Sequence, residues 1–247
     1  MVKKCKWFAG FLSLLLISGL AWADTKTEEL IKDIESKVSA ITSYRADIVM
    51  KMEMMGQTMS HEGKMSYKKP DMIRLEMKMD KPMPMTTITV SDGNISYQYM
   101  PEMKMVQKVN LKEIGDLPSA DGQNSCDLSK PFNGVVKDTI KYAGEEELDG
   151  KKTSVLEGKP ITSPGVEIPF QKFKLWIGIE DGVLRKMAGF NGDGKEVMSQ
   201  ELKNIELNPV FAEDTFRFTP PEGVQVLDMT ESIKSMLESM KAKPSEK

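Results

Sequence analysis

Over most of the chain, apolar and polar residues alternate with a period of two, the pattern of a β-strand with one buried face. In Tyr44–Met54, one face carries Tyr, Ala, Ile and Met, whereas Arg45, Asp47, Lys51 and Glu53 lie on the other. The same alternation predicts further strands at Gly63–Lys68, Met72–Met79, Thr86–Ser91, Asn94–Tyr99, from Met103 and Met105, at Thr153–Glu157, Lys172–Ile179, Val183–Phe190 and Val197–Ile205, and at Phe216 and Phe218.

A helical period replaces the alternation at both ends of this strand-rich region. Leu30, Ile34, Val38 and Ile41 recur on one face of a helix that we predict over about Thr25–Thr42. A second helix is predicted after Asp228, because Asp228-x-x-Glu231 is a start signal for an apolar face that follows. That face consists of Ile233, Met236, Leu237 and Met240.

The middle of the chain breaks the strand rhythm. Residues 110–140 are polar and turn-rich in part, and we expect a connector with one or two short helices, the first over Asn110–Leu117. The acid-rich run Glu145–Glu147 is interpreted as a solvated loop. Asp92-Gly93 and Asp181-Gly182 are hairpin turn signals between strands.

These elements predict one fold class. A sheet of about ten or eleven antiparallel strands curls strongly, and its apolar face needs a cover that the amphipathic helices supply. The predicted fold is therefore α+β, an unclosed (half) antiparallel β-barrel with helices covering the concave face.

The first residues have the pattern of a signal peptide. Lys3, Lys4 and Lys6 precede an uncharged run of 16 residues, which is short of the ~20 that span a bilayer as a helix. Ala21-Trp22-Ala23 is a small-x-small cleavage signal, so we expect residues 1–23 to be removed after Ala23. No cysteine stands where a lipoprotein signal is lipidated, and the mature protein is expected to be soluble.

The composition of the chain excludes several kinds of binding and catalytic site. Removal of the three lysines of the signal peptide changes the formal net charge from −3 to −6. An acidic chain of this kind lacks the electrostatic signature of a nucleic-acid-binding protein. Only Cys126 remains in the mature chain, so no internal disulfide is expected, and His61 is the only histidine. A single histidine argues against Ser-His-Asp, Cys-His and multi-His zinc chemistry. No catalytic residue, metal site or cofactor is predicted, and we expect a protein that is not an enzyme.

Methionine is the compositional anomaly, since 14 of the 20 methionines lie between Met50 and Met105. Methionine fills irregular gaps in ordinary cores. It also suits a surface that accepts variable apolar guests, because its unbranched side chain repacks easily. An ordinary core and a groove for a greasy ligand both remain open on this evidence.

Copper is a third interpretation of the methionines. Thioethers are soft ligands that suit Cu(I), and Met59, His61 and Met65 would be the candidate ligands, with Met-x-Met pairs at 50/52/54, 77/79, 83/85 and 103/105. The i, i+2 spacing, however, is also what one face of any strand provides.

Three segments resemble motifs of the LolA-like periplasmic lipoprotein carriers. Val90–Gly93, with Asn94–Tyr99 and Met100-Pro101 behind it, is similar to the family's VSDG…Y.P hairpin. Tyr67–Arg74 resembles the strand pair around a family K-R-P, and Phe216–Val226 is similar to F.F.PP.GV.V. The motifs keep the family's order, and the resemblance covers nearly all of 24–228.

The resemblance implies an unclosed barrel whose helices form a lid over an apolar cavity for lipoprotein acyl chains. In that family the lipoprotein comes from an inner-membrane transporter and passes to an outer-membrane acceptor. Lys69 stands where better-known members carry a lid-latching arginine, whose planar fork a lysine does not reproduce. The C-terminal helix has no clear counterpart in the family pattern.

The predicted sites combine this resemblance with the strand alternation. The lid residues are Leu30, Ile34, Val38, Ile41 and Lys69. The residues predicted to line the cavity are Met50, Met52, Met54, Met65, Tyr67, Leu75, Met77, Met79, Ile88, Val90, Tyr97, Tyr99, Met103 and Met105.

The resulting hypothesis is a monomeric periplasmic carrier of lipoprotein acyl chains or another lipid. Its domains would be a signal peptide (1–23), a carrier domain (24–228) and a C-terminal helix with a solvated tail (229–247). Two alternatives stay open: a periplasmic sensor or interaction domain on the same fold, and a Met-rich protein that handles Cu(I).

Overall fold

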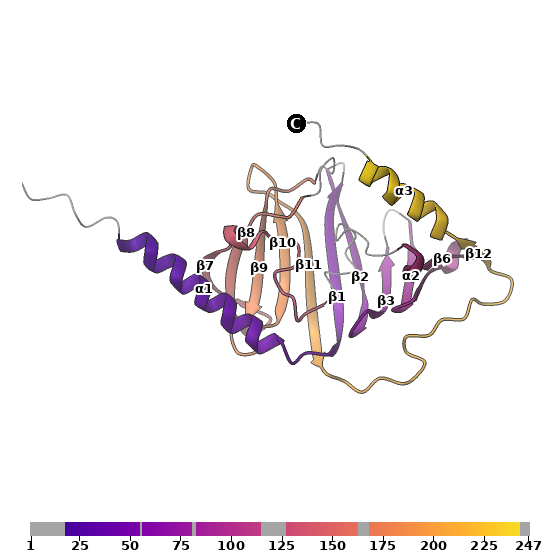
Figure 1. Ribbon diagram of the computed structural model, residues 1–247, viewed down its shortest axis with the longest axis horizontal. Coiled ribbons are helices and arrows are strands. Elements are labelled where there is room, and N and C mark those ends of the chain that lie inside the picture. The colour runs from indigo at the N-terminus through magenta and orange to yellow at the C-terminus, as the bar shows by residue number, and fades with distance from the viewer. Residues whose placement is uncertain (1–17, 55, 81–82, 115–126, 163–167, 243–247) are drawn as a thin grey trace, which may run out of the picture.

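The computed structural model describes residues 18–54, 56–80, 83–114, 127–162 and 168–242 of the chain (Figure 1). Within these described residues, twelve strands form one sheet in the order β12-β6-β5-β4-β3-β2-β1-β11-β10-β9-β8-β7. The strands are β1 Ser43–Met54, β2 Gln57–Lys68, β3 Met72–Met79, β4 Met85–Asp92, β5 Ile95–Met100, β6 Met105–Asn110, β7 Lys141–Leu148, β8 Lys151–Gly158, β9 Lys172–Gly178, β10 Leu184–Phe190, β11 Glu196–Leu207 and β12 Gln225–Asp228.

Two antiparallel meanders make up the sheet. Strands β1–β6 form one and β7–β11 the other, and the antiparallel pairing of β1 with β11 joins them. Among the described pairs, β12 with β6 is the parallel one. The edges β7 and β12 are far apart in the strand order, so the sheet is an unclosed half-barrel and the predicted α+β class is confirmed.

The tight turn between β4 and β5 shows how the sequence sets this topology. Gly93 adopts a φ of +87°, a region that glycine enters without strain. The Asp92 carboxylate accepts hydrogen bonds from the backbone N–H groups of Asn94 and Ile95, each at 2.8 Å. Burial alone would raise the pKa of Asp92, but these N–H groups outweigh it, and the pKa is lowered. The Asp-Gly signal therefore builds the predicted hairpin.

The two faces of the sheet bury different clusters. On the face that we call inner, Tyr44, Ala46 and Ile48 of β1 pack with Val38 of helix α1 (Ser18–Val38) and Leu128 of the connector. A second inner cluster joins α1 and the connector to β8 and β9: Ile34, Phe132, Val135, Ile140, Leu156, Phe173, Leu175 and Ile177. The outer face of the same meander has a smaller cluster of Val155, Trp176 and Ala188.

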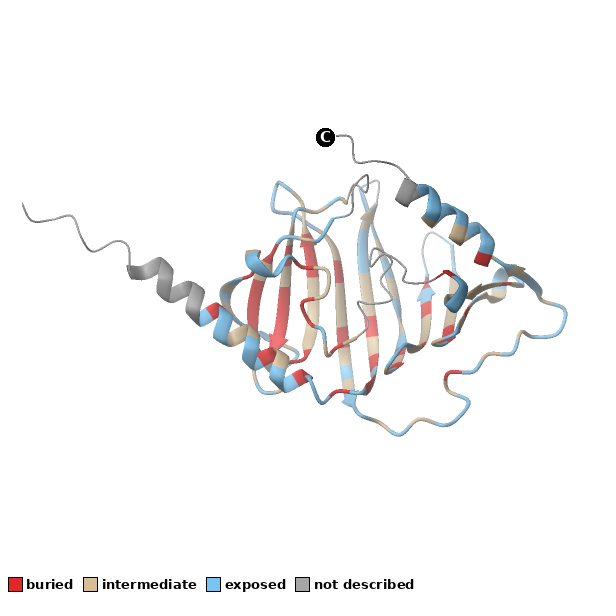
Figure 2. Cartoon of the chain, in the orientation of Figure 1, coloured by how far each residue is buried: buried red, intermediate tan, exposed pale blue. Residues whose placement is uncertain are grey.

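Helix α1 lies across the inner face on the side of β7–β10 (Figures 1 and 2). In the middle of the helix, the Lys26 ammonium lies 5.4 Å from the centre of the Tyr142 ring on β7. Near its end, the helix passes so close to Gly182 that an added Cβ would lie 3.0 Å from Lys37 Cβ. Lys37 Nζ also donates a hydrogen bond to the Ile179 carbonyl, at 2.8 Å. The middle and the carboxyl end of the helix are thereby fixed to the β7–β10 side of the sheet.

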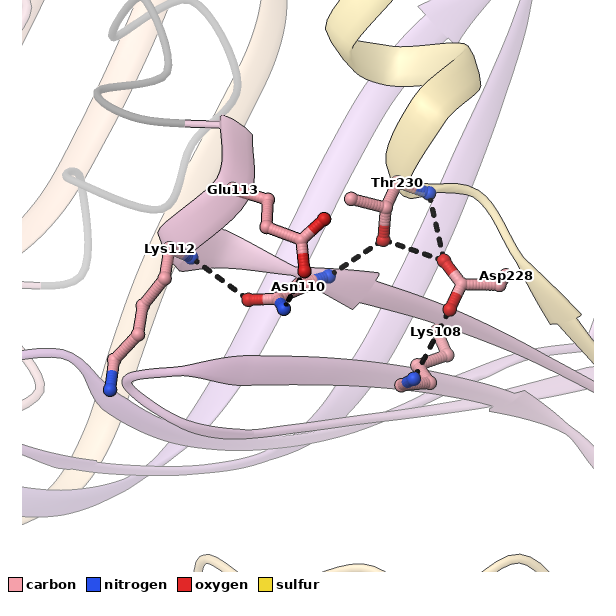
Figure 3. Close-up of polar contacts among 6 residues, drawn as sticks. All are labelled: Lys108, Asn110, Lys112, Glu113, Asp228 and Thr230. Carbon is pink, nitrogen blue, oxygen red and sulfur yellow. Dashed lines mark hydrogen bonds and ion pairs between the residues drawn. The ribbon is translucent and has the colours of Figure 1, made fainter.

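At the opposite edge, two short helices meet strands β6 and β12 (Figure 3). They are α2 (Leu111–Ile114) and α3 (Thr230–Ala242). Asp228 accepts hydrogen bonds from the Thr230 backbone N–H and hydroxyl, at 3.1 and 2.6 Å, and from Lys108 Nζ, at 3.1 Å. The Thr230 hydroxyl in turn accepts the Asn110 N–H at 3.0 Å. Asp228 thus caps α3, as the sequence predicted.

The same contacts set the charge state of Asp228. The hydrogen bonds from Thr230, followed by the one from Lys108, lower the pKa of the Asp228 carboxyl to about 2. The pKa of Lys108 is raised by the same pair, because its ammonium donates to Asp228. Both groups are therefore charged across the physiological range, and they hold α3 at the edge of the sheet.

Several sequence-based boundaries were wrong. The acidic run Glu145–Glu147 belongs to β7 rather than a loop, because its backbone pairs with β8 while the three residues stay exposed. Phe216 and Phe218 form no strand. A twelfth strand comes later, at Gln225–Asp228, where it pairs with β6 instead of with a sequence neighbour.

The first helix is longer at its start than predicted. It begins at Ser18, passes through the predicted cleavage position after Ala23, and ends at Val38 instead of Thr42. Cys126 and residues 1–17 lie outside the described residues. Within the described part of the chain, no helix combines the length and the apolar character needed to cross a membrane.

Candidate ligand-binding face

Strand register gathers the methionines on one surface. Directly opposed residues of antiparallel strands lie on the same face of a sheet, with Cβ atoms about 4.5–5.5 Å apart. On the inner face, Met50 opposes His61, and His61 opposes Met79. Met52 opposes Met59, and Met79 opposes Met85. The methionine face, as we call this inner surface of β1–β6, comprises Met50, Met52, Met59, Met65, Met77, Met79, Met85, Met100 and Met105.

Burial varies along the methionine face. Met65, Met77 and Met79 are buried, and Met65 Sδ accepts a hydrogen bond from the Tyr44 hydroxyl at 3.2 Å. Towards the β1–β2 hairpin, Met52 is 42% exposed. The other described methionine side chains of this face are half-buried. Figure 2 shows the same trend, with less buried ribbon in β1–β6 than in β8–β10.

Eight of the predicted cavity residues lie on this inner face: Met50, Met52, Met65, Tyr67, Leu75, Met77, Met79 and Met105. The side chain of Met54 lies outside the described residues. Met103 was placed wrongly, because it belongs to the 3-10 helix Pro101–Met103 and is 59% exposed.

Ile88, Val90, Tyr97 and Tyr99 were also assigned to the wrong face. Val90 opposes Arg74 and Tyr97, and Ile88 opposes Glu76 and Tyr99, so all four lie on the outer face. The inner positions of β4 are instead Met85, Thr87, Thr89 and Ser91.

The cause of this error is a cover that comes from far along the chain. Residues 208–224, which we call the strap, join β11 to β12 and run along the lower right of the view in Figure 1. The Phe218 ring of the strap lies 5.4 Å from the Tyr97 ring and 5.8 Å from the Tyr99 ring. Arg74 donates to the Thr215 carbonyl of the strap at 3.5 Å. On the outer face, which carries charged residues in β1 and β3, Val90 is therefore buried and Ile88, Tyr97 and Tyr99 are half-buried.

The four apolar residues predicted to form the lid all pack against the inner face of the sheet. Ile34, Val38 and Ile41 are buried against the inner clusters, and Leu30 packs beside them. Lys69 lies between β2 and β3, and its backbone N–H donates to the Thr42 carbonyl at 2.8 Å. Within the described residues, no hydrogen bond or ion pair joins the Lys69 ammonium to a helix. The latch role of Lys69 therefore stays a prediction.

Sequence reasoning missed three residues of the methionine face, namely Met59, Met85 and Met100. Met59 falls in the first half of β2, where Ser, His, Glu and Gly interrupt the apolar alternation. Counting back from the hairpin at Gly56 would have placed Met59 opposite Met52. The pairing of strands, and not hydropathy, identifies inner-face positions of this kind.

The outer face carries a hollow of different chemistry. A hollow of about 880 Å³ spans β11, β1, β2 and β3 and is lined mostly by polar and charged side chains, among them Asp47, Glu62, Lys64, Lys78 and Lys203. The pKa of Lys203 is raised, chiefly because its ammonium is hydrogen-bonded to Glu201. This charged lining does not suit an acyl chain, and the methionine face is the better candidate.

The comparisons with known structures agree with this fold. A protein of Thermus thermophilus, described as an uncharacterized conserved protein, superimposes with a TM-score of 0.52 at 13% identity, covering 82% of this chain and 99% of that one. Half-barrels with helices on the inner face are therefore the class of structure to which this chain belongs. No family model matches the sequence.

Proteins of similar sequence identify the family to which the chain belongs. An outer-membrane lipoprotein carrier protein of Dechloromonas aromatica is 31% identical over 166 residues, which is 67% of this chain and 70% of that protein. The chain belongs to the family of outer-membrane lipoprotein carrier proteins, and the predicted LolA-like resemblance is confirmed. An uncharacterized protein of Methanocaldococcus jannaschii is 28% identical over 222 residues, and this chain spans 59% of its length.

Proposed function

We propose that this protein carries the acyl chains of lipoproteins, or another lipid, on its methionine face and moves them from the inner to the outer membrane. Family membership supports a lipid-binding carrier. The observation that carries the finer proposal is the register of β1–β6, which brings nine methionines to one inner surface.

The physical case rests on apolar transfer. Each buried CH₂ contributes ~0.8 kcal/mol, so an acyl chain does not cross water without a cover. Half-buried methionines such as Met50 and Met105 can adopt new rotamers around chains of different length and shape. The inner positions Thr87 and Thr89 of β4 carry short side chains between the methionines of the neighbouring strand and β5.

Release requires a second state of the protein. Helix α1 is held on the opposite side of the sheet by contacts such as Lys37 with Ile179, which follows β9, and Glu35 with Lys137 of the connector. A movement of α1 towards the methionine face would compete with a bound chain and lower its affinity. The carrier would then pass its load to an acceptor without an external energy source.

The proposed cellular setting follows from the predicted signal peptide. Cleavage after Ala23 would leave a monomeric protein in the periplasm, with its first helix shortened to start near Asp24. An inner-membrane transporter and an outer-membrane acceptor are the proposed partners. Amino-terminal sequencing of the protein recovered from periplasmic extract tests the cleavage site.

A pair of neighbouring threonines gives a sharp binding test. Thr87 is half-buried on the inner face opposite Met77, and Thr86 is half-buried on the outer face opposite Lys78. Thr87→Glu places a carboxylate against the acyl chain, and we expect affinity for a fluorescent fatty-acyl probe to fall ~10-fold or more, since an uncompensated polar group costs ~1–3 kcal/mol. Thr86→Glu is the matched control and should stay within about twofold of the parent protein.

Two results would contradict the proposal. One is a parent protein that binds neither the probe nor an acylated peptide and yields no lipid in mass spectrometry of native material. The other is an equal loss of probe binding in both threonine variants while circular dichroism shows both to be folded. Lipid recovered with the parent and depleted in Thr87→Glu would support the methionine face as the site.

A further inference from the structure

One row of the methionine face contains a nitrogen donor between two thioethers. His61 of β2 lies directly opposite Met50 of β1 on one side and Met79 of β3 on the other. Directly opposed Cβ atoms are about 4.5–5.5 Å apart, a spacing that lets long side chains converge above the sheet. Met85 continues the row on β4, and Met52 and Met59 form the next pair towards the hairpin.

His61 is the single histidine of the chain, and its side chain has an unusual environment. Its side chain is half-buried on an apolar face, and no hydrogen bond or ion pair reaches it from any residue that the structure describes. The row itself offers no carboxylate or amide to His61, because its direct neighbours are the thioethers of Met50 and Met79.

We infer that Met50, His61 and Met79 form a binding site for Cu(I). Thioethers are soft donors that select Cu(I), and imidazole is a good ligand for copper. All three donors are neutral, so a monovalent ion leaves a smaller net charge on this apolar face than a divalent ion would. The described residues contain no group of three His, Cys, Asp or Glu side chains that could hold a metal, so hard-donor chemistry has no comparable site there.

The register changes the ligand set that the linear sequence suggests. Met65 follows His61 at i+4 on the same strand, but it is only 1% exposed, and its sulfur already accepts the Tyr44 hydroxyl. Met59 belongs to the neighbouring row, opposite Met52. The cross-strand neighbours Met50 and Met79, which are far from His61 in sequence, are the donors that the sheet places beside the imidazole.

The site also has a route for the ion. Met52 lies one row closer to the β1–β2 hairpin than Met50 and is 42% exposed. Met59 opposes it and is half-buried. A soft ion that arrives from solvent therefore meets thioethers at the rim before it reaches His61. This inference does not depend on whether the same face carries lipid.

The test is a titration of the full mature chain with Cu(I) under anaerobic, reducing conditions, in competition with the chromophoric chelator bicinchoninate. Met50→Leu, Met79→Leu and His61→Phe keep the positions apolar and remove one donor each. Loss of a group that only supports a metal ligand lowers metal affinity by roughly 10–100-fold. Loss of a ligand itself, as in each of these variants, should therefore weaken Cu(I) binding by at least as much. X-ray absorption of the copper-loaded protein should show two sulfur neighbours and one nitrogen neighbour.

Two matched controls make the result specific. Met72→Leu changes a half-buried methionine on the outer face of β3, and Met65→Leu changes the buried methionine of the linear pattern. Both should leave Cu(I) affinity within about twofold, since neither removes a proposed donor. The inference is wrong if the parent chain fails to compete with the chelator. It is equally wrong if the control variants lose as much affinity as the row variants, or if the row variants lose none.

Discussion

The two sides of the inner face are built from different side chains. Under α1, strands β8 and β9 present Leu156, Leu175 and Ile177, which are at most 1% exposed. On β1–β6 the corresponding surface is rich in methionine, and several of these side chains are only half-buried. One continuous sheet therefore has a packed side and an adaptable side.

The difference is physical. Leucine and isoleucine have few preferred rotamers and specify one arrangement, so they suit a core that holds a helix in place. Methionine has three rotatable bonds and specifies packing poorly, which suits a surface with changing occupants. The β7–β10 meander is thus the frame to which α1 is attached, and the methionine face is the part free to respond to a ligand.

The packed side should be the more sensitive to truncation. Leu175→Ala removes a side chain that is 1% exposed and leaves a cavity, so we expect a loss of ~2–5 kcal/mol in the free energy of unfolding. Met100→Ala on the half-buried methionine face should cost ~1 kcal/mol. Urea unfolding followed by circular dichroism measures both, and equal losses would erase the proposed distinction.

One position of the adaptable side is nevertheless rigid. A Cβ on Gly63 would lie 1.9 Å from the Glu76 carbonyl oxygen, which is backbone and cannot easily move. Gly63→Ala should therefore destabilise the protein by ~1–3 kcal/mol. In Gly192→Ala the nearest contact is the flexible end of Gln171 at 3.3 Å, so its thermal midpoint should change little. A Gly63 variant as stable as the parent would show that β2 and β3 can separate.

Removing the phenylalanine ring that covers Tyr97 and Tyr99 tests whether these tyrosines lie outside the ligand site. Phe218→Ala exposes the Tyr97 and Tyr99 rings and should cost ~1–2 kcal/mol, because a half-buried aromatic contact is lost. The affinity for the fatty-acyl probe should not change, since Phe218 lies on the outer face. Differential scanning calorimetry and probe titration on the same preparation check both expectations, and a loss of binding would return the tyrosines to the ligand site.

The smallest expected effect concerns the far edge of the sheet. The pKa of Asp228 is lowered to about 2 in the folded protein, against ~3.9 in an unfolded chain. Ionised Asp228 therefore contributes stability above about pH 4, and that contribution is lost as the pH falls through about 2. Asp228→Asn should lower the thermal midpoint slightly at pH 6, with a difference from the parent that shrinks between pH 4 and pH 2. A pH-independent difference would mean that the hydrogen bonds, and not the charge, matter.

Local patterns determined much of the fold. Alternation from Tyr44 to Met54 and from Met72 to Met79 predicted β1 and β3 to within one residue. Asp92-Gly93 predicted its hairpin, and the apolar spacing of Ile34 and Val38 predicted the helix face that is buried. These features depend on residues close in sequence, so the sequence by itself was sufficient to determine them.

Which face each strand buries was decided only by the tertiary structure. Alternation shows that Ile88 and Val90 share a face, but the strap, more than a hundred residues later, decides that this face is the outer one. In the same way, His61 has no methionine beside it in the chain, and the pairing of three strands places Met50 and Met79 next to it. Hydropathy records how apolar a position is, whereas its neighbours come from register and from distant segments that cover the sheet.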